Sequence, residues 1–350
     1  MTTYISLVAQ HENLGDLVIR QLSLDWASDL GEPIHALVDS GASDYVASLA
    51  FPESVRLFSS RSRWYASLLR EIIFGGRPNL VYAAGPQKLR WNKKTYLNGI
   101  LGIVAHGLLF LGRGRVAKIG RSLDHDSPIG GLLEAQLLRQ ASYYSVRDAP
   151  SALTSASRFR TPRVAPDIGF SYPYQPSRGV DRNIVSFALR PTEGFDVGAV
   201  QRVVDDCLLA GFRCQVVVQV RNDSKLADLI SQTCGIHLVP WSLDTTPLDQ
   251  LDRVLLEYSQ SAAVVTNRLH AAVFAAGMGA APVAFEASTT AKVSRTLATA
   301  EVDCWAVTEF QPSRASQAAH TERIERQVQS AREQLEAERR LFLEAMTGAR

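Results

Sequence analysis

Three polar side chains follow an apolar run in the last third of the chain. Residues 262–266 predict a buried strand, and Asn267, Arg268 and His270 come where that strand should end. An arginine carries a permanent charge, and histidine is the side chain whose ordinary pKa lies nearest neutral pH. Lys292 follows the next predicted strand and adds a third positive group. Together they predict a site for an anionic substrate that carries a phosphate or a carboxylate.

The same residues also fit a structural interpretation. A histidine at the start of a helix often makes only structural hydrogen bonds, and an arginine beside it often pairs with a carboxylate. The functional interpretation gains support from the helix predicted next, at residues 271–276, because most of its side chains are small.

A second polar cluster lies near the start of the chain. A strand predicted at residues 4–9 is followed by Asn13, Gly15 and Asp16, and residues 17–26 have helical spacing. Gly15 would let a ligand approach the backbone closely, whereas Asp16 at a helix start also fits a simple cap. No G-x-G-x-x-G or Walker A pattern is present, so neither a dinucleotide site nor a P-loop is supported.

Composition bounds the class of protein. The 350 residues, 46% of them hydrophobic, suffice for two domains of ordinary size. The net charge of +2 implies no polyanion-binding tail, and the local basic clusters carry no nucleic-acid recognition motif.

The chain has four cysteines, which form no C-x-x-C pair and are expected to be reduced core thiols: Cys207, Cys214, Cys234 and Cys304. The first residues lack the pattern of a signal peptide, so we expect a cytoplasmic protein.

Two segments suggest other roles and are interpreted structurally. The apolar stretch at residues 99–112 is too short to span a bilayer, and it predicts a core helix, with a partly membrane-facing helix as the alternative. Asp124, His125 and Asp126 resemble a D-x-D metal signature, but a turn that caps a helix from Pro128 explains them better. No metal site is predicted.

The chain alternates strand and helix throughout, which predicts an α/β fold with the same doubly wound logic in both halves. The predicted strand at residues 116–119 ends in a polar loop at residues 120–124, like other strands of the first half. A proline-rich stretch at residues 171–182 marks the expected domain boundary. Residues 319–346 predict one long C-terminal helix, which fits packing on its own domain or contacts in a homo-oligomer.

Several short motifs, taken in their order and spacing, resemble one known family. They are Asn13-Leu14-Gly15-Asp16, Ser145-Val146-Arg147-Asp148 with Ser151, Ala165-Pro166-Asp167-Ile168-Gly169-Phe170, residues 186–191, Thr266-Asn267-Arg268-Leu269-His270-Ala271-Ala272, Ala281-Pro282-Val283 and Lys292. This set is similar to the polysaccharide pyruvyl transferase family and covers most of the chain. The loop at residues 120–124, where the family usually carries Gly-Pro, and the residues just before Lys292 depart from its pattern.

The resemblance implies two facing Rossmann-like domains, similar to B-type glycosyltransferases, with a long C-terminal helix. Residues 1–175 would form the acceptor side, residues 183–315 the donor side and residues 316–350 the helix. It also implies transfer of pyruvate from phosphoenolpyruvate to a sugar of a polysaccharide or glycolipid, often as a cyclic ketal. No cofactor is expected beyond phosphoenolpyruvate as the donor substrate.

The roles implied by the resemblance fall on ten residues. Arg268, Arg190, Lys292 and Asn267 would bind the donor; His270 and Asp16 would be catalytic; Asn13, Gly15, Arg147 and Asp148 would bind the acceptor. Helix capping or pairing with a neighbour remains the alternative for Asp16 and Asp148.

Two other functions stay open from the sequence. A nucleotide-sugar glycosyltransferase of the same fold would need an acidic residue to bind the ribose, and Glu286 could serve. A non-catalytic partner in glycan assembly would have the same fold but no catalytic activity. The partner expected is a glycan or lipid-linked saccharide, and a lipid-linked acceptor would bring the protein to the inner face of the membrane. Neither the acceptor sugar nor the oligomeric state follows from the sequence.

Overall fold

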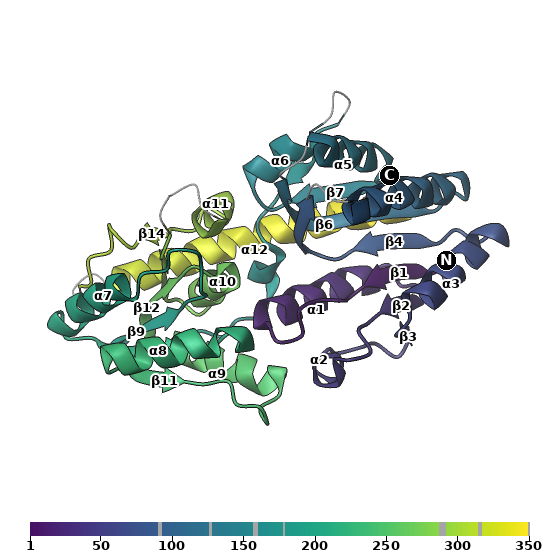
Figure 1. Cartoon of the computed structure of the whole chain (residues 1–350). Coiled ribbons are helices and arrows are strands. Elements are labelled where there is room, and N and C mark those ends of the chain that lie inside the picture. The colour runs from purple at the N-terminus through teal and green to yellow at the C-terminus, as the bar shows by residue number, and fades with distance from the viewer. Residues whose placement is uncertain are drawn as a thin grey trace. The chain divides into compact units, whose positions relative to one another are not determined.

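The computed structural model describes residues 1–89, 93–125, 128–156, 160–177, 179–286, 292–313 and 317–348 (Figure 1). The chain divides into two compact units. The first comprises Met1–Ala9, Ile19–Ile168 and Gln334–Arg350, and the second comprises Gln10–Val18 and Gly169–Glu333. Ser288, Thr289, Thr290 and Ala291, which depart from the family pattern, lie outside the described residues.

The first unit is built on a parallel sheet with the strand order β3-β2-β1-β4-β6-β7-β8, and β5 pairs with β6. Its strands are β1 Thr3–Ser6, β2 Ile34–Leu37, β3 Val55–Phe58, β4 Asn79–Tyr82, β5 Gly85–Leu89, β6 Arg115–His125, β7 Tyr143–Val146 and β8 Arg163–Val164. The helices that connect them are α1 Leu14–Ser28, α2 Ser43–Ala47, α3 Arg61–Ile73, α4 Lys93–Leu111, α5 Pro128–Gln140 and α6 Ala149–Ser155.

The second unit has a parallel sheet of its own, with the order β11-β10-β9-β12-β13-β14. Its strands are β9 Ile184–Ala188, β10 Arg213–Val217, β11 His237–Val239, β12 Ser261–Thr266, β13 Ala281–Ala284 and β14 Trp305–Ala306. Its helices are α7 Val197–Leu209, α8 Ser224–Cys234, α9 Pro247–Ser259, α10 Leu269–Gly277 and α11 Lys292–Thr299, with short 3-10 turns at Ile168–Ser171 and Arg221–Asp223. The long helix α12, Gln317–Thr347, ends the chain's regular structure. The expected α/β fold with Rossmann-like units and a long C-terminal helix is therefore confirmed.

The strand β6 is longer than the sequence predicted. It continues through residues 120–124, where a polar loop was expected, and ends at His125. Gly120 adopts a φ of +49°, which glycine tolerates better than other residues, and this bend interrupts the register with β7. Arg121 then donates from Nη1 to the carbonyl of Ala83 at 2.9 Å, which ties the extension to the end of β4. Asp126 of the suspected metal signature lies outside the described residues.

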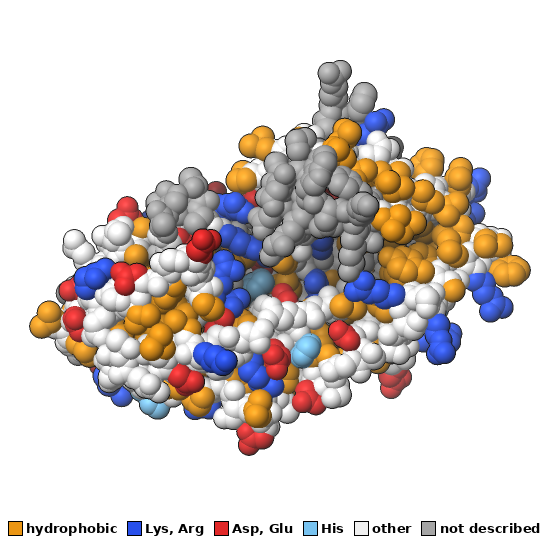
Figure 2. Space-filling model, in the orientation of Figure 1, with side chains coloured by type: hydrophobic (Ala, Val, Ile, Leu, Met, Phe, Trp, Pro, Cys, Tyr) orange, Lys and Arg blue, Asp and Glu red, His pale blue; other side chains and the backbone are white. Residues whose placement is uncertain are grey.

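The helix α4 corrects a second expectation, because the apolar stretch at residues 99–112 is not a buried core helix. Leu101 is 56% exposed and Phe110 is 74% exposed, whereas Leu109 is fully buried. Figure 2 shows hydrophobic side chains gathered on this side of the first unit, at the right of the view. Apolar composition alone had indicated burial, but only one face of the helix meets the sheet. No helix in the described ranges is both long and apolar enough to cross a bilayer.

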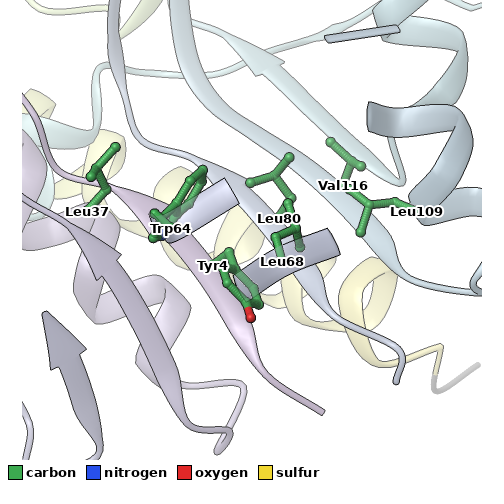
Figure 3. Close-up of a cluster of buried hydrophobic side chains, with 7 residues drawn as sticks. All are labelled: Tyr4, Leu37, Trp64, Leu68, Leu80, Leu109 and Val116. Carbon is green, nitrogen blue, oxygen red and sulfur yellow. The ribbon is translucent and has the colours of Figure 1, made fainter. Parts of the chain in front are cut away.

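The core beneath α3 and α4 holds the first sheet together. Trp64 and Leu68 of α3 and Leu109 of α4 pack against side chains of the central strands, Tyr4 and Leu80 among them (Figure 3). Burying a side chain of this size contributes roughly 1.5–3 kcal/mol, so this cluster fixes both helices on the sheet.

Candidate functional site

The order of strands in the second sheet brings three loops to one place. The central strand β9 lies between β10 and β12, and all three run parallel, so their carboxyl ends share an edge. The chain leaves β9 towards β10 on one side and returns through β12 on the other. Such a reversal of strand order is where open α/β sheets bind ligands. The loops that meet there carry Arg190 after β9, Asp223 after β10 and Arg268 after β12.

Small residues allow α10 to pack directly on the sheet behind this edge. Every residue of α10 except His270 is buried. At its last residue, Gly277, an added Cβ would lie 2.3 Å from the Tyr174 ring, so only glycine fits. The tight packing sets the helix start, with its unpaired backbone N–H groups, at the end of β12.

Asn267 fixes the loop that carries Arg190. Its side-chain Oδ1 accepts from the backbone N–H of Arg190 at 2.8 Å, and its Nδ2 donates to the carbonyl of the same residue at 3.0 Å. Asn267 is buried, whereas the side chain of Arg190 is exposed. Both ends of the amide therefore hold backbone, and the contribution of Asn267 is to position Arg190. Direct contact with a donor stays a prediction.

Arg268 is held by a carboxylate that the sequence did not single out. Its Nε and Nη2 donate to the two carboxylate oxygens of Asp223 at 2.8 and 2.5 Å. The backbone N–H of Arg268 donates to Thr266 Oγ1 at 2.9 Å, which fixes the turn. Burial raises the pKa of Asp223, while the charges of Arg268 and Arg190 act in the opposite direction. Arg268 is thus the partner of the Asp223 carboxylate, and the positive charge of Arg190 acts on it electrostatically.

His270 lies against the first turn of α1. A Cβ added to Gly15 would come within 2.1 Å of His270 Nδ1, so a glycine is required for the imidazole to occupy its position. On its other side the ring stacks on Phe274, with centroids 6.4 Å apart and an angle of 29° between the planes. The half-buried imidazole is therefore held between α1 and the next turn of its own helix.

The segment Gln10–Val18 belongs to the second unit because it is bonded to the loop after β10. Asn13 forms an antiparallel bridge with Val220, and the N–H of Leu14 donates to the carbonyl of Gln219 at 3.4 Å. Glu12 pairs with Arg221 at 3.3 Å. The residues expected on the acceptor side near the start of the chain thus lie in the same unit as His270.

Asn13 acts as the cap of α1. Its Oδ1 accepts from the N–H of Gly15 at 3.1 Å, which satisfies one of the unpaired amides at the helix start. Asp16 follows in the first turn, half-buried, and accepts from the N–H of Gln10 at 3.2 Å. These contacts fix the turn next to His270, and roles in catalysis or acceptor binding stay predictions.

Lys292 and Glu286 flank the segment that follows β13. Lys292 is the first residue of α11 and is half-buried. The carboxylate of Glu286 accepts from the backbone N–H groups of Val293 and Ser294 at 3.1 and 3.4 Å, so it caps α11. Glu286 thus already has a structural task, and the contact of Lys292 with a donor stays a prediction.

Arg147 and Asp148 lie in the first unit, both buried. Arg147 pairs with Asp167 through Nη1 at 2.7 Å. Asp148 caps α6 by accepting from the N–H and the hydroxyl of Ser151 at 2.9 and 2.7 Å. These contacts of the two residues are structural, and their part in acceptor binding stays a prediction.

Gly15 offers a test of the arrangement around His270. Replacing Gly15 with Ala places a methyl group where the imidazole lies, so His270 must move or the start of α1 must shift. We expect the protein to lose about 1–3 kcal/mol of stability. A matched Gly107→Ala variant in α4, where the added Cβ meets nothing within 4 Å, should be at least as stable as the wild type, because alanine favours a helix. Denaturant unfolding measures both effects, and a Gly15→Ala protein as stable as the wild type would disprove the contact.

Solved structures share the fold over nearly the whole chain. UDP-GlcNAc 2-epimerase from Neisseria meningitidis, bound to UDP-GlcNAc, matches with a TM-score of 0.60 at 8% identity, covering 99% of this chain and 100% of that one. UDP-GlcNAc 2-epimerase from Methanocaldococcus jannaschii, in complex with UDP-GlcNAc and UDP, matches with a TM-score of 0.51 at 11% identity, covering 96% and 99%. At such identities the likeness establishes the two-unit fold and nothing about the reaction.

The sequence itself carries a more specific likeness. No curated protein matches it. The family model described as polysaccharide pyruvyl transferase, however, matches residues 13–289, which is most of the chain. The match begins at Asn13, includes the loops of Arg190 and Asp223, and extends past Arg268 and His270. This chain belongs to the polysaccharide pyruvyl transferase family.

Proposed function

We propose that this protein transfers pyruvate from phosphoenolpyruvate to a sugar of a polysaccharide or glycolipid and closes a cyclic ketal across two hydroxyls. The observation that carries the proposal is the presence of two arginines at one edge of the second sheet, where Arg268 pairs with Asp223 and Asn267 holds the backbone of Arg190. In the same unit, His270 lies against Gly15 at the start of the next helix. Family membership supports a polysaccharide-acting transferase, and the chemistry of these residues supports the donor.

Phosphoenolpyruvate carries two anionic groups on a three-carbon frame, and the cluster suits it. Arginine can bind a phosphate or carboxylate through two parallel hydrogen bonds. Asp223 engages Nε and Nη2 of Arg268, which orients the guanidinium, and we expect its Nη1 to bind the ligand. Arg190, presented on the loop that Asn267 fixes, supplies the second cation. The start of α10 adds backbone N–H groups that favour an anion.

The reaction then requires that the methylene carbon gain a proton and that a sugar hydroxyl attack C2. His270 donates a proton to the methylene carbon, which becomes the methyl group, and C2 develops oxocarbenium character. The first sugar hydroxyl bonds to C2 and gives up its proton to a base, for which Asp16 on the adjacent turn is the candidate. The second hydroxyl forms the other C–O bond as the C–O bond to phosphate breaks, and its proton returns to the imidazole of His270. The products are the ketal and inorganic phosphate, so atoms and protons balance.

A nucleotide-sugar glycosyltransferase is the second candidate, and one observation weakens it. Glu286, the residue suited to bind a ribose, caps α11 with both of its carboxylate oxygens. The epimerases that share the fold hold UDP-GlcNAc, so this ligand is the proper competitor in a binding test.

Thermal unfolding with each candidate donor separates these functions. A ligand at 100 times its Kd adds about 2.7 kcal/mol to the stability of the folded state. We expect phosphoenolpyruvate to raise the Tm of the wild type and UDP-GlcNAc to leave it unchanged. Because charge-assisted hydrogen bonds contribute about 1.5–3 kcal/mol, Arg190→Ala should bind phosphoenolpyruvate roughly ten- to a hundredfold more weakly.

The matched control is Arg202→Ala, which removes a surface arginine of α7 that pairs with exposed Asp196. It should bind the donor like the wild type. Stabilisation by UDP-GlcNAc alone would favour the glycosyltransferase. Stabilisation by neither ligand, with or without added glycosides, would favour a non-catalytic glycan-binding role.

A further inference from the structure

One face of α4 is a row of exposed aliphatic side chains. Its members recur every three or four residues, so they lie along one side of the helix. Their exposed fractions run from 37% at Leu108 to 79% at Leu111. We call this row the apolar stripe; it consists of Leu97, Ile100, Leu101, Val104, Leu108 and Leu111.

The opposite face of α4 fixes the helix, so the apolar stripe cannot turn inward. Leu109 is fully buried and packs in the cluster with Leu68. His106 is fully buried, and its Nε2 lies 3.1 Å from the hydroxyl of Tyr82. An added Cβ at Gly102 would lie 3.5 Å from Leu137 of α5. The apolar stripe therefore stays exposed on a helix that is already docked.

The end of α3 extends the apolar surface. A Cβ added to Gly112, just after α4, would lie 3.3 Å from Ile72 Cγ2, so the two helix ends are neighbours. Beyond Ile72, the side chains of Ile73 and Phe74 are 76% and 79% exposed, and Phe110 on α4 adds a second exposed aromatic ring. Contiguous apolar surface of this kind marks an interaction site rather than ordinary exposure.

The charges in the segments that carry this surface are mostly positive. Glu71 is the one acidic residue in the sequence between Arg61 and Arg121, and its carboxylate accepts from the hydroxyl of Tyr4 at 3.0 Å. Arg70, Arg77 and Arg113 are exposed at the ends of the two helices, and α4 begins with two lysines in the sequence. Lys and Arg side chains border the hydrophobic surface in Figure 2.

We propose that the apolar stripe and the end of α3 form a membrane-docking surface that lies in the plane of an anionic lipid bilayer. The aliphatic and aromatic side chains enter the boundary between headgroups and acyl chains, and the arginines at the helix ends bind lipid phosphates. A second copy of the chain is the less suitable occupant. A twofold interface pairs a surface with the same surface on the second copy. The arginines at the edge of one copy would then lie near those of the other and repel them.

Flotation of the full-length protein with large unilamellar vesicles tests the proposal. We expect binding to phosphatidylcholine vesicles that contain about one third phosphatidylglycerol, and weak binding to phosphatidylcholine alone or at high salt. The double variant Leu101→Gln/Leu111→Gln should lower the partition coefficient about tenfold or more, because it removes two inserted side chains. Arg70→Gln and Arg113→Gln should each lower it roughly fivefold on the anionic vesicles alone.

The control is Leu209→Gln/Leu243→Gln, which replaces two leucines that are each 87% exposed in the second unit. It should bind vesicles like the wild type, and unchanged Tm values show that all variants fold. The proposal would be overturned if the wild type did not bind vesicles. It would also be overturned if the stripe variant bound vesicles as strongly as the wild type. A wild-type dimer that the stripe variant converts to a monomer, without vesicle binding, would assign the surface to a second copy instead.

Discussion

Replacing His270 with Gln should lower turnover about 100- to 10,000-fold, the usual contribution of a general acid or base. Glutamine keeps a similar size beside Gly15 and Phe274 but cannot transfer a proton to the methylene carbon. Affinity for phosphoenolpyruvate should therefore stay within a few-fold of the wild type. Phosphate released from phosphoenolpyruvate with a panel of glycosides measures turnover, and calorimetry measures donor affinity.

The control for this variant is His237→Gln, an exposed histidine of β11 in the same unit. It should leave turnover unchanged. If His270→Gln retained most of the wild-type turnover, the proton would come from another group, and the pairing of His270 with Gly15 would be structural only.

Replacing Arg268 with Ala should damage both binding and stability. The donor loses one of its two cations, so its Kd should rise roughly ten- to a hundredfold. Asp223, which is 8% exposed, would be left without the partner that engages both of its oxygens, and this should cost about 3 kcal/mol of folding free energy. Denaturant unfolding and calorimetry with phosphoenolpyruvate measure the two losses separately.

A second substitution and a pH series separate these effects. The double variant Arg268→Ala/Asp223→Ala should recover most of the stability, because no buried charge is left unpaired, but it should not recover donor binding. Burial raises the pKa of Asp223 and Arg268 opposes that rise, so the pKa should be higher still in Arg268→Ala. A protonated carboxyl group carries no charge, so its burial does not require a cationic partner. The stability lost in Arg268→Ala should therefore be largest near neutral pH and shrink as the pH falls through this pKa. A pH-independent loss would show that the ion pair is not its cause.

Residues at strand ends were predictable because of a general property of parallel sheets. The strand predicted at residues 262–266 is β12, Ser261–Thr266, because the apolar run there ends in polar residues. The sequence also indicated that Arg268 follows a strand, the family resemblance implied that Arg190 binds the same donor, and parallel strands share their carboxyl edge. Their convergence could thus be expected before any coordinates were known.

Two contacts could not be expected from the sequence in the same way: that of Asp223 with Arg268 and that of Gly15 with His270. Asp223 lies in a short 3-10 turn several residues beyond β10, and only the adjacency of β10 and β9 brings it to Arg268. Gly15 and His270 are far apart in the chain, and no periodic pattern couples them. The glycine was predicted to admit a ligand, whereas its visible effect is to admit the imidazole.

The exposure of α4 was mispredicted for a different physical reason. Composition shows that a segment is apolar but not what covers it, and a core helix and a surface-docking helix can have the same residues. The basic residues on either side of the segment were the available signal, because a core helix needs no cationic flanks.

The interleaving of the two units bears on how the chain is made. Trp26 packs against Phe342, with ring centroids 5.6 Å apart, and Tyr143 donates to Glu338 at 3.0 Å, so the first unit needs residues that are synthesised after the second sheet. The second unit in turn needs Gln10–Val18, which are synthesised before most of the first unit. Neither unit can be completed during translation from one continuous stretch. Cutting the gene at the proline-rich boundary would give two fragments that each lack part of their own unit.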